Sequence, residues 1–453
     1  MKRFLMWGTG LFIGLSSGLW GCSTLRHRLD TAPVDANAPA RFEGLLLALS
    51  DADQNASAYG DGKLGRVAGL EDSLSLIRLV NGKPQISRVH VSNSVVSWPS
   101  IAAVVTDSAG RRLAYIVETK GRPADGVQQV KSPFFDLPDG KVLTTVDIGT
   151  PTRVLDRREM GGTYLGTVSV NHRRDLLVIP SKTKGRELLL VSLKNGLPAR
   201  EWAFPGLPVA REGSDAGTNA IAFHPTDDVF AVNTDNNRVS FYRAVRLGDS
   251  LRVEPIGAPM PVGRSISVMN WLPDGSHLLV TDTNWKPGAL GPILNDRGRL
   301  FSIRFDAGGS HQVVSEAEVG LSPEGFDISP DGRLAVTCNM RRTYLPGNLP
   351  IRRLVPAHDK SSLSLVTISP AGMLKTVGEW GFEGALPEDA VFDATGQAVA
   401  ATIYNNLLED FPRQGYIEFW NVTRTPAGEP TLVRTNLRMP VPRGVHNLLT
   451  VKP

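Results

Sequence analysis

Cysteine is almost missing from this 453-residue sequence, which contains only Cys22 and Cys338. A framework of several disulfides is therefore excluded as the source of its stability. Residues 334–338 read Leu-Ala-Val-Thr-Cys, a run that is typical of a β-strand. We therefore expect Cys338 to be a buried, inert thiol and not a nucleophile.

Motifs for common cofactors and catalytic groups are also missing. The sequence has no phosphate-binding or dinucleotide-binding glycine loop and no CxxCH motif for haem. Its eight histidines show no close metal-ligand spacing, so zinc is not expected. A GxSxG string at residues 14–18 lies in an apolar run without the strand-turn-helix context of a hydrolase nucleophile. His224 falls in a predicted turn, where a structural role is expected.

Neither sign of charge dominates, because 49 basic and 45 acidic residues are mixed along the chain. The sequence shows no cluster of basic residues of the kind that binds nucleic acid, so we expect no nucleic-acid partner. Aromatic residues make up only 7% of the sequence, whereas it has 45 glycines and 32 prolines. This composition favours many strands joined by many turns.

The N-terminus has the organisation of a secretory signal. Lys2 and Arg3 precede an apolar stretch over residues 4–20, and no second apolar run of membrane-spanning length follows it. Residues 1–21 are therefore expected to be removed and are excluded from the fold.

Residues 19–22 (Leu-Trp-Gly-Cys) resemble the bacterial lipobox, although Trp20 stands where a small residue is usual. The resemblance implies a lipoprotein in which Cys22 is acylated and inserts into the lipid bilayer. Lipidation would leave the mature chain without an intramolecular disulfide. Ser23 replaces the Asp of inner-membrane retention, which implies the outer membrane, facing the periplasm. A linker over residues 22–40 follows. An ordinary cleaved signal or an uncleaved anchor is the alternative.

A repeated unit dominates the rest of the chain: an apolar strand, a tight polar turn and a second apolar strand. Its clearest copy is Phe-Asp-Ile-Ser-Pro-Asp-Gly-Arg-Leu-Ala-Val at residues 326–336. Other copies cover residues 104–115, 168–179, 221–232, 269–280 and 390–401. In the turn, Pro presets φ, Asp bonds the following backbone and Gly accepts a positive φ. Each copy is followed by another strand pair, so each period holds about four strands, which is one blade of a propeller.

Six units are visible, and the chain ends supply a seventh. Residues 442–451 read as a first strand, and residues 42–95 hold the missing outer strands, including 45–49 and 73–77. Pairing the two ends would close the ring and protect its last edge. The sequence therefore predicts one all-β domain over residues 41–453, a seven-bladed β-propeller of four-stranded blades.

The Ser-Pro-Asp-Gly-Arg-Leu-Ala-Val element at 329–336, with its flanking strands, resembles the repeats of the lactonase-type and YVTN-type seven-bladed propellers. The resemblance covers nearly all of the mature chain. It implies the architecture and says little of function, because that fold carries hydrolases, oxidoreductases, haem-binding domains and scaffolds.

Polar residues gather in the segments that lead into three predicted innermost strands. These segments read Pro-Glu-Gly at 323–325, Pro-Glu-Asp at 387–389 and Pro-Arg-Gly at 442–444. In a propeller they surround one mouth of the central channel. The predicted site therefore has Glu324, Glu388, Arg443 and Asn219 at the mouth, with Asp327 and His446 further down. The alternative is a solvated polar rim.

Three predicted loops on the same face are long and cover residues 284–297, 339–360 and 405–413. Long loops are usually functional or disordered. The polar and aromatic residues they carry are Trp285, Arg341, Arg342, Tyr344, Arg352, Arg353, His358 and Asp359. An arginine-rich wall beside paired glutamates suits a carboxylated or phosphorylated ligand. A partly disordered cover is the alternative.

Residues 51–57 begin like a calcium loop, but Ala56 replaces the turn glycine and Gly62 the closing acid. Calcium at this loop, or between Glu324 and Glu388, is a minor expectation, and we identify no other cofactor.

Two functions stay open. The first is a monomeric, lipid-anchored propeller without catalytic activity, which binds an envelope protein or a small anionic ligand through its long-loop face. The second follows from the resemblance: a lactonase-like hydrolase of a small anionic or sugar-derived substrate. Glu324 or Glu388 would be its general base, His446 its proton shuttle and Arg443 its oxyanion partner. We favour binding, because the sequence shows no catalytic triad.

Overall fold

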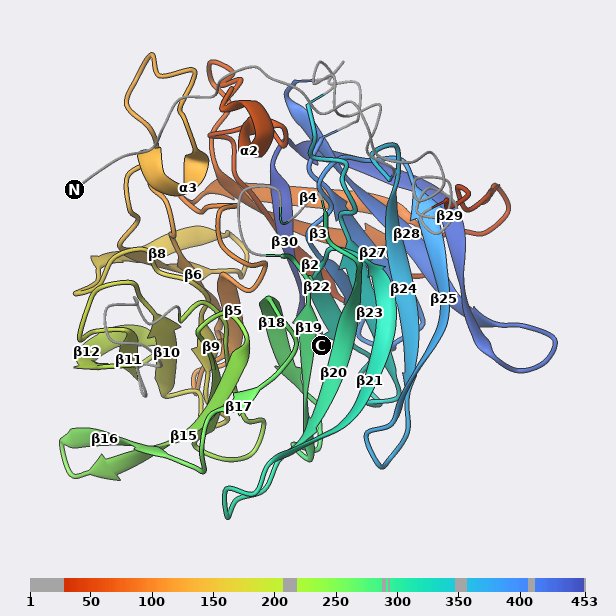
Figure 1. Ribbon diagram of the computed structural model, residues 1–453. Coiled ribbons are helices and arrows are strands. Elements are labelled where there is room, and N and C mark those ends of the chain that lie inside the picture. The colour runs from red at the N-terminus through yellow and green to blue at the C-terminus, as the bar shows by residue number, and fades with distance from the viewer. Residues whose placement is uncertain are drawn as a thin grey trace, which may run out of the picture.

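The computed structural model describes residues 28–206, 218–286, 291, 294–346, 357–405 and 412–451. Strands make up nearly all of the regular structure in these ranges. The two helices found there are single turns, α2 (Ala58–Asp61) and α3 (Pro133–Asp136), and both lie at the same end of the molecule (Figure 1). The predicted all-β class is confirmed.

The strands form seven sheets, which stand as blades around a central axis (Figure 1). In blades 2 to 7 the four main strands follow each other in sequence order from the innermost to the outermost, whereas in blade 1 the innermost strand is the last strand of the chain. Blade 1 contains β30 (Val445–Val451), β2 (Leu45–Ser50), β3 (Ser73–Val80) and β4 (Lys83–His90). Blade 2 contains β5 (Ala102–Thr106), β6 (Arg112–Val117), β7 (Val142–Asp147) and β8 (Arg153–Glu159). Blade 3 contains β9 (Ser169–Val170), β10 (Leu176–Pro180), β11 (Leu188–Lys194) and β12 (Leu197–Phe204).

The remaining four blades follow the same plan. Blade 4 contains β13 (Ile221–Phe223), β14 (Val229–Thr234), β15 (Arg238–Leu247) and β16 (Ser250–Pro255), with β17 (Met260–Pro261) beside β15. Blade 5 contains β18 (Ile266–Trp271), β19 (His277–Asp282), β20 (Arg297–Arg304) and β21 (Gln312–Leu321). Blade 6 contains β22 (Pro323–Ile328), β23 (Leu334–Asn339), β24 (Ser361–Ile368) and β25 (Leu374–Phe382). Blade 7 contains β26 (Ala390–Phe392), β27 (Ala398–Ile403), β28 (Gln414–Arg424) and β29 (Pro430–Pro442).

Blade 1 closes the ring as the sequence predicts. Its innermost strand β30 comes from the C-terminus, and its three other strands come from the N-terminal part of the chain. The two ends pair antiparallel, with Leu47 opposite Leu449 and Leu49 opposite Asn447. The seven-bladed architecture and its closure by both chain ends are therefore confirmed.

The polar turns fix the register between the first two strands of a blade. In blade 6 the amide of Gly332, at φ 71°, donates to the carbonyl of Ser329, and the amide of Leu334 donates to the Ser329 hydroxyl. A positive φ favours glycine at that position. With this turn in place, Asp327 lies opposite Val336 in the ladder.

The core lies between the faces of neighbouring blades. Between blades 6 and 7, for example, Val336, Leu363, Phe392 and Trp420 form one buried cluster. Packed sheets of this kind derive most of their stability from apolar area removed from water. Cys338 belongs to the same cluster and its burial is confirmed; burial also raises the pKa of its thiol well above the ordinary value.

The antiparallel order gives the ring two different ends. The segments that lead into the innermost strands, and the connections between second and third strands, lie at one end, which we call the loop end. The hairpin turns between first and second strands lie at the other end, the turn end. Connections at the loop end include the predicted long ones and two that the sequence analysis did not identify as long loops, residues 51–72 and 118–141.

The described part of the predicted linker lies against the ring. β1 (Val34–Asp35) pairs parallel with β29, and the amide of Ala32 donates to the carbonyl of Gly381. The Lys360 ammonium donates to the carbonyl of Leu29. Cys22 lies outside the described residues, so its acylation stays a prediction. Within the described ranges, no helix has the length and apolar character needed to cross a membrane.

Candidate functional site

Three of the predicted site residues come together below the loop end. Glu324 lies in β22, Glu388 just before β26 and His446 in β30, on three consecutive blades. Their side chains are enclosed, with exposed fractions of 5%, 2% and 0%. His446 is thus level with Glu388 and not further down the channel. These three residues, which we call the acid–imidazole group, do not form an open rim.

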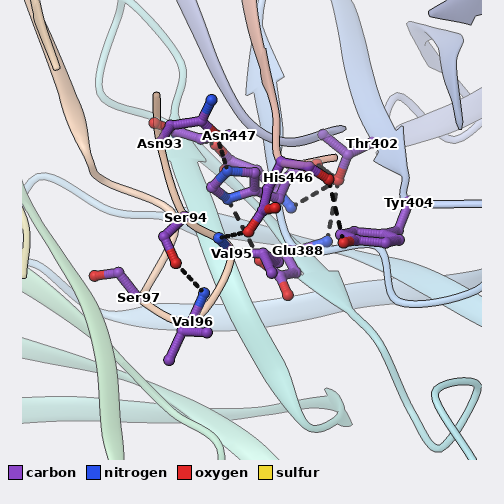
Figure 2. Close-up of polar contacts among 12 residues, drawn as sticks. Asn93, Ser94, Val95, Val96, Ser97, Glu388, Thr402, Tyr404, His446 and Asn447 are labelled. Carbon is purple, nitrogen blue, oxygen red and sulfur yellow. Dashed lines mark hydrogen bonds and ion pairs between the residues drawn. The ribbon is translucent and has the colours of Figure 1, made fainter. Parts of the chain in front are cut away.

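Glu388 and His446 face each other (Figure 2). Glu388 Oε2 lies 3.7 Å from His446 Nδ1, and neither atom has a hydrogen-bond partner among the described residues. His446 Nε2 lies 2.9 Å from Asn93 Oδ1. The Asn93 amide nitrogen donates to the carbonyls of Ser50 and Val91, so its oxygen must face the imidazole. Nε2 therefore carries the proton, and Nδ1 presents a lone pair to Glu388.

Burial decides the charge of this group, because it disfavours the ionised form of each member. Burial raises the pKa of Glu324 to about 8. The pKa of Glu388 is raised well above its ordinary value by burial first, then by the charges of Glu324 and Asp51. Burial lowers the pKa of His446 to about 3. At neutral pH two carboxylic acids therefore lie beside a neutral imidazole.

Two tyrosines complete the surroundings of the carboxyl groups. The Tyr404 hydroxyl donates to the carbonyl of Gln54, and the Tyr59 hydroxyl to that of Val95. The pKa of each phenol is raised well above its ordinary value by burial first, and the charge of Glu388 contributes to both shifts. Figure 2 shows Tyr404 and Val95 on either side of Glu388. Sequence reasoning missed both tyrosines, because neither lies in the repeat.

Arg443 is held by the chain itself. Its guanidinium donates to Asn55 Oδ1 at 2.6 Å and to the carbonyls of Gly65 and Ala52 at 2.8 and 3.0 Å, and its side chain is fully buried. These contacts fasten the connection between β2 and β3 to the start of β30. Its predicted part in stabilising an oxyanion stays a prediction.

The other two predicted channel residues lie apart from the acid–imidazole group. Asn219 is half-buried just before β13 in blade 4. Asp327 is half-buried in β22, and one of its carboxylate oxygens accepts a hydrogen bond from the amide of Phe392. Asp327 is among the residues that line the central cavity described below.

Most of the described residues of the predicted loop wall are packed inward, whereas Asp359 is exposed. Arg341 and Arg342 are only 3% and 4% exposed, and burial lowers the pKa of both. The Trp285 indole donates to the Ser322 hydroxyl and lies against Trp98, with ring centroids 5.9 Å apart. His358 is half-buried. Arg352 and Arg353 lie outside the described residues. Ligand binding by this wall stays a prediction.

A buried apolar cluster lies over the acid–imidazole group at the loop end. It draws side chains from the connections of several blades: Ala56, Val95, Met340, Tyr344, Leu345, Ala385, Leu386 and Tyr404. Tyr59 and Trp285 pack against it. This cluster, which we call the loop-end cluster, contains Tyr404 and contacts Tyr59, the two tyrosines whose pKa values the charge of Glu388 raises, so it adjoins the buried carboxyl groups.

The axis of the ring holds a cavity of about 450 Å³, which we call the channel cavity. Residues from the innermost strands of all seven blades line it. Its lining extends from Asp389 and Asn447 to Pro225, Pro273 and Pro330, which belong to hairpin turns. The cavity therefore reaches the turn end, opposite the predicted long-loop face. Its volume is in the usual range of small-molecule sites.

The calcium-like loop contributes to an acidic cluster. Asp51, Asp53 and Asp72 each place one carboxylate oxygen within 4.8 Å of the others. However, the Asp51 oxygens accept hydrogen bonds from the amides of Asp53 and Val95, and an Asp72 oxygen accepts one from the amide of Ala52. These hydrogen bonds hold the loop in place, and they suffice to explain why the three carboxylates lie close together. Calcium binding there stays a prediction.

Comparison with known proteins supports the architecture. No protein-family model matches the sequence, and no curated protein matches it. Among solved structures, it resembles a "putative 6-phosphogluconolactonase" from Bacteroides uniformis, with a TM-score of 0.56 and 13% identity over 90% of this chain and 100% of that one. A functionally unknown protein from Desulfotomaculum acetoxidans gives a TM-score of 0.56 with 9% identity, over 91% and 100%. A protein from Lactobacillus plantarum gives 0.54 with 12% identity, over 90% and 99%.

These likenesses define the class of the chain as a seven-bladed β-propeller. At such low identity they show the fold alone, since one propeller architecture carries many unrelated functions.

Proposed function

We propose that this protein is a lipid-anchored propeller of the bacterial cell envelope that binds a small molecule in its channel cavity. The observation that carries the proposal is the cavity itself, about 450 Å³ in volume and lined by all seven innermost strands. Rigid strands hold its walls, and binding sites built on rigid elements are well preorganised. Binding of an envelope protein at the loop end stays a prediction.

Enclosure of the acid–imidazole group supports binding over catalysis. General acid–base catalysis requires a group within hydrogen-bond reach of the substrate. Glu388 and His446 are at most 2% exposed, beneath the loop-end cluster. The channel cavity, in contrast, is bounded by Asp389 and Asn447 and not by this pair.

A thermal-shift screen of the full-length protein in lipid nanodiscs tests the proposal. The compounds are small amphipathic molecules in neutral, anionic and cationic forms. A compound at about 100 times its dissociation constant adds roughly 2.7 kcal/mol to the free energy of unfolding, which raises the melting temperature measurably. Val170 lines the cavity, so Val170→Trp narrows it and is expected to remove the shift.

Val313→Trp is the matched control, because Val313 is exposed on the outermost strand of blade 5. A compound that stabilises the wild type and Val313→Trp, but not Val170→Trp, supports binding in the channel cavity. A compound that stabilises all three proteins equally binds elsewhere. That result, or the lack of any shift across the three charge classes, contradicts the proposal.

A second candidate function is a lactonase-like hydrolase. It is favoured by the 3.7 Å approach of Glu388 Oε2 to His446 Nδ1, and by the likeness in fold to the Bacteroides uniformis protein. With the protonation described above, His446 would accept the proton of the attacking water. A glutamic acid would then protonate the leaving alkoxide. These roles reverse those expected from the sequence, and they require the loop-end cluster to open.

Hydrolysis of sugar lactones by the full-length protein, measured above the spontaneous rate, tests this second function. Glu388→Gln is expected to lower kcat/KM by about 100-fold or more, in the range typical of general acid–base groups. Glu429→Gln, on an exposed turn, is the control. No turnover by the wild type, or equal turnover by Glu388→Gln, excludes this function for the acid–imidazole group.

A further inference from the structure

The channel cavity has one sign of charge. The charged residues among those that line it are three aspartates, Asp327, Asp389 and Asp393, and its lining includes no lysine, arginine or histidine. Burial raises the pKa of Asp389 well above its ordinary value. The negative charge is therefore assigned to Asp327 and Asp393, which belong to blades 6 and 7 on one side of the axis. An anion inside the cavity would meet like charge and no basic side chain among the lining residues, which is unfavourable at the low polarity of such a site.

Asn447, one of the residues that line the cavity, has a hydrogen-bond acceptor without a partner among the described residues. The Asn447 amide nitrogen donates to Asp389 Oδ2 at 2.8 Å, so the amide oxygen must point away from that carboxylate. This Asn447 Oδ1 atom is buried, the residue being 2% exposed, and it has no hydrogen-bond partner among the described residues. Buried acceptors are nearly always satisfied, by protein, water or ligand.

Both carboxylate oxygens of Asp389 accept hydrogen bonds from neighbouring residues of the fold. One of its oxygens accepts from Asn447 and from the amide of Leu448, and the other accepts from the amide of Ala390. Asp393 likewise stabilises the turn after β26, where its carboxylate accepts hydrogen bonds from the amides of Gln397 and Ala398. Asp327 is the carboxylate that lies along the wall of the channel, half-buried. One Asp327 oxygen likewise accepts a hydrogen bond, from the amide of Phe392. However, Asp389 and Asp393 are only 4% and 1% exposed, whereas Asp327 is half-buried, so the ligand's charge is assigned to Asp327.

The remaining walls are apolar and aromatic. The largest side chains that line the cavity are Phe223, Trp271, Phe326 and Phe392, together with aliphatic residues such as Leu449. Aromatic faces attract cations as well as apolar groups. A molecule that fits must therefore combine a hydrocarbon body with a positively charged hydrogen-bond donor.

We propose that the channel cavity binds a monovalent organic cation, a protonated amine attached to an apolar or aromatic body. The ammonium group donates to Asn447 Oδ1 and pairs with Asp327, and the body lies against Trp271 and Phe326. The inference rests on the proposed binding function and adds the chemical class of ligand. It departs from the anionic ligand that the arginines of the long loops led us to expect.

Three probes of similar size and different charge test this inference: phenethylammonium, 2-phenylethanol and 3-phenylpropionate. Their binding to the full-length protein in nanodiscs is measured by isothermal titration calorimetry, with empty nanodiscs as blank. The cation is expected to bind at least about tenfold more tightly than the alcohol, since hydrogen bonds to charged groups contribute about 1.5–3 kcal/mol. The anion is expected not to bind.

Asp327→Asn preserves the size of the side chain and removes its charge. This variant is expected to weaken binding of the cation about tenfold and to leave the alcohol unchanged. Asp249→Asn, on the exposed outer hairpin of blade 4, is the matched control and is expected to change neither. Equal affinities for the three probes, tighter binding of the anion, or an unchanged cation affinity in Asp327→Asn overturns the inference.

The same titrations separate this inference from the proposed function. A neutral or anionic compound could prefer the wild type and lose its binding in Val170→Trp. That result would support the channel as a binding site and overturn only the preference for cations. If the cation binds Val170→Trp as tightly as the wild type, its site is outside the channel, and both proposals fail.

Discussion

Glu324 shows how a single buried carboxyl group makes stability depend on pH. Burial raises its pKa in the folded protein to about 8, against 4.5 for an ordinary glutamate. Between these values the folded protein holds a proton that the unfolded chain releases. The free energy of unfolding therefore falls as pH rises, by up to about 1.4 kcal/mol per pH unit for one proton. His446, with a pKa lowered to about 3, acts in the opposite direction, but only below its ordinary value of 6.5.

The window from pH 6.5 to about 8 is therefore free of the His446 effect. There we expect Glu324→Gln to reduce the downward slope of stability against pH by about 1.4 kcal/mol per pH unit. Urea unfolding at several pH values measures this slope. Glu429→Gln, at an exposed position, should keep the wild-type slope. Equal slopes for the wild type and Glu324→Gln would show that Glu324 ionises normally in the folded protein.

Gly444 is the residue that lets β30 approach the loop beside it. Its φ is +87°, and a Cβ atom there would lie 1.6 Å from the carbonyl oxygen of Asp51. Gly444→Ala is therefore expected to cost about 4 kcal/mol or more, because the backbone must move. Gly428→Ala is the matched control: its φ is +80°, but nothing lies within 4 Å. This variant should cost about 1–2 kcal/mol, the price of the left-handed backbone alone. Denaturant unfolding of both variants compares the two costs, and equal costs would contradict the close approach.

At the scale of elements, β30 matters most, because it is the strand that joins the two ends of the chain. Without it, β2 would present an unpaired inner edge, and blades 1 and 7 would lose a packed neighbour. We expect a chain that ends at Pro442 to lose its cooperative unfolding transition and to aggregate. Circular dichroism during heating and size-exclusion chromatography measure these effects.

A synthetic peptide of residues 443–453 provides the control for this truncation. Added to the shortened chain, it should restore a cooperative transition, because it supplies the missing innermost strand. A truncated chain that unfolds cooperatively at the wild-type temperature without the peptide would contradict the role of β30 in closing the ring.

The loops show a second principle at the scale of elements: the sequence reveals how long a loop is, but it does not reveal how the loop packs. Residues 339–360 were predicted to form a wall with arginines turned toward a ligand. The structure buries Arg341 and Arg342 and places Tyr344 in the loop-end cluster. Whether a loop stands out or folds inward depends on its neighbours in space, here the connections of other blades, which no local pattern reveals.

At the scale of the whole molecule, the proposed location of the protein at the outer membrane depends on Cys22. Two or three acyl chains on one cysteine hold a protein firmly to a bilayer, at about 0.8 kcal/mol per buried CH₂ group. We expect Cys22→Ala to abolish incorporation of radiolabelled palmitate and to reduce the protein in the outer-membrane fraction. Cys338→Ala is the control, because its buried thiol is not available for acylation. Unchanged labelling in Cys22→Ala would contradict the lipid anchor.

The sequence by itself determined the architecture. The repeated strand-turn-strand units, the glycines in their turns and the incomplete first and last units predict a closed ring of seven blades, and the structure confirms it. These features are local, because a hairpin depends on neighbouring residues and on the alternation of apolar side chains.

Only the tertiary structure decided which polar residues meet and which of them water reaches. Glu388, His446 and Asn93 come from distant parts of the chain, and their contact exists only because the ring closes. The channel cavity likewise combines one short stretch from each blade. Burial, which sets the pKa values of Glu324 and His446, and the one-signed charge of the cavity arise from the packing of all seven blades. Such properties depend on distance in space and not on distance along the chain.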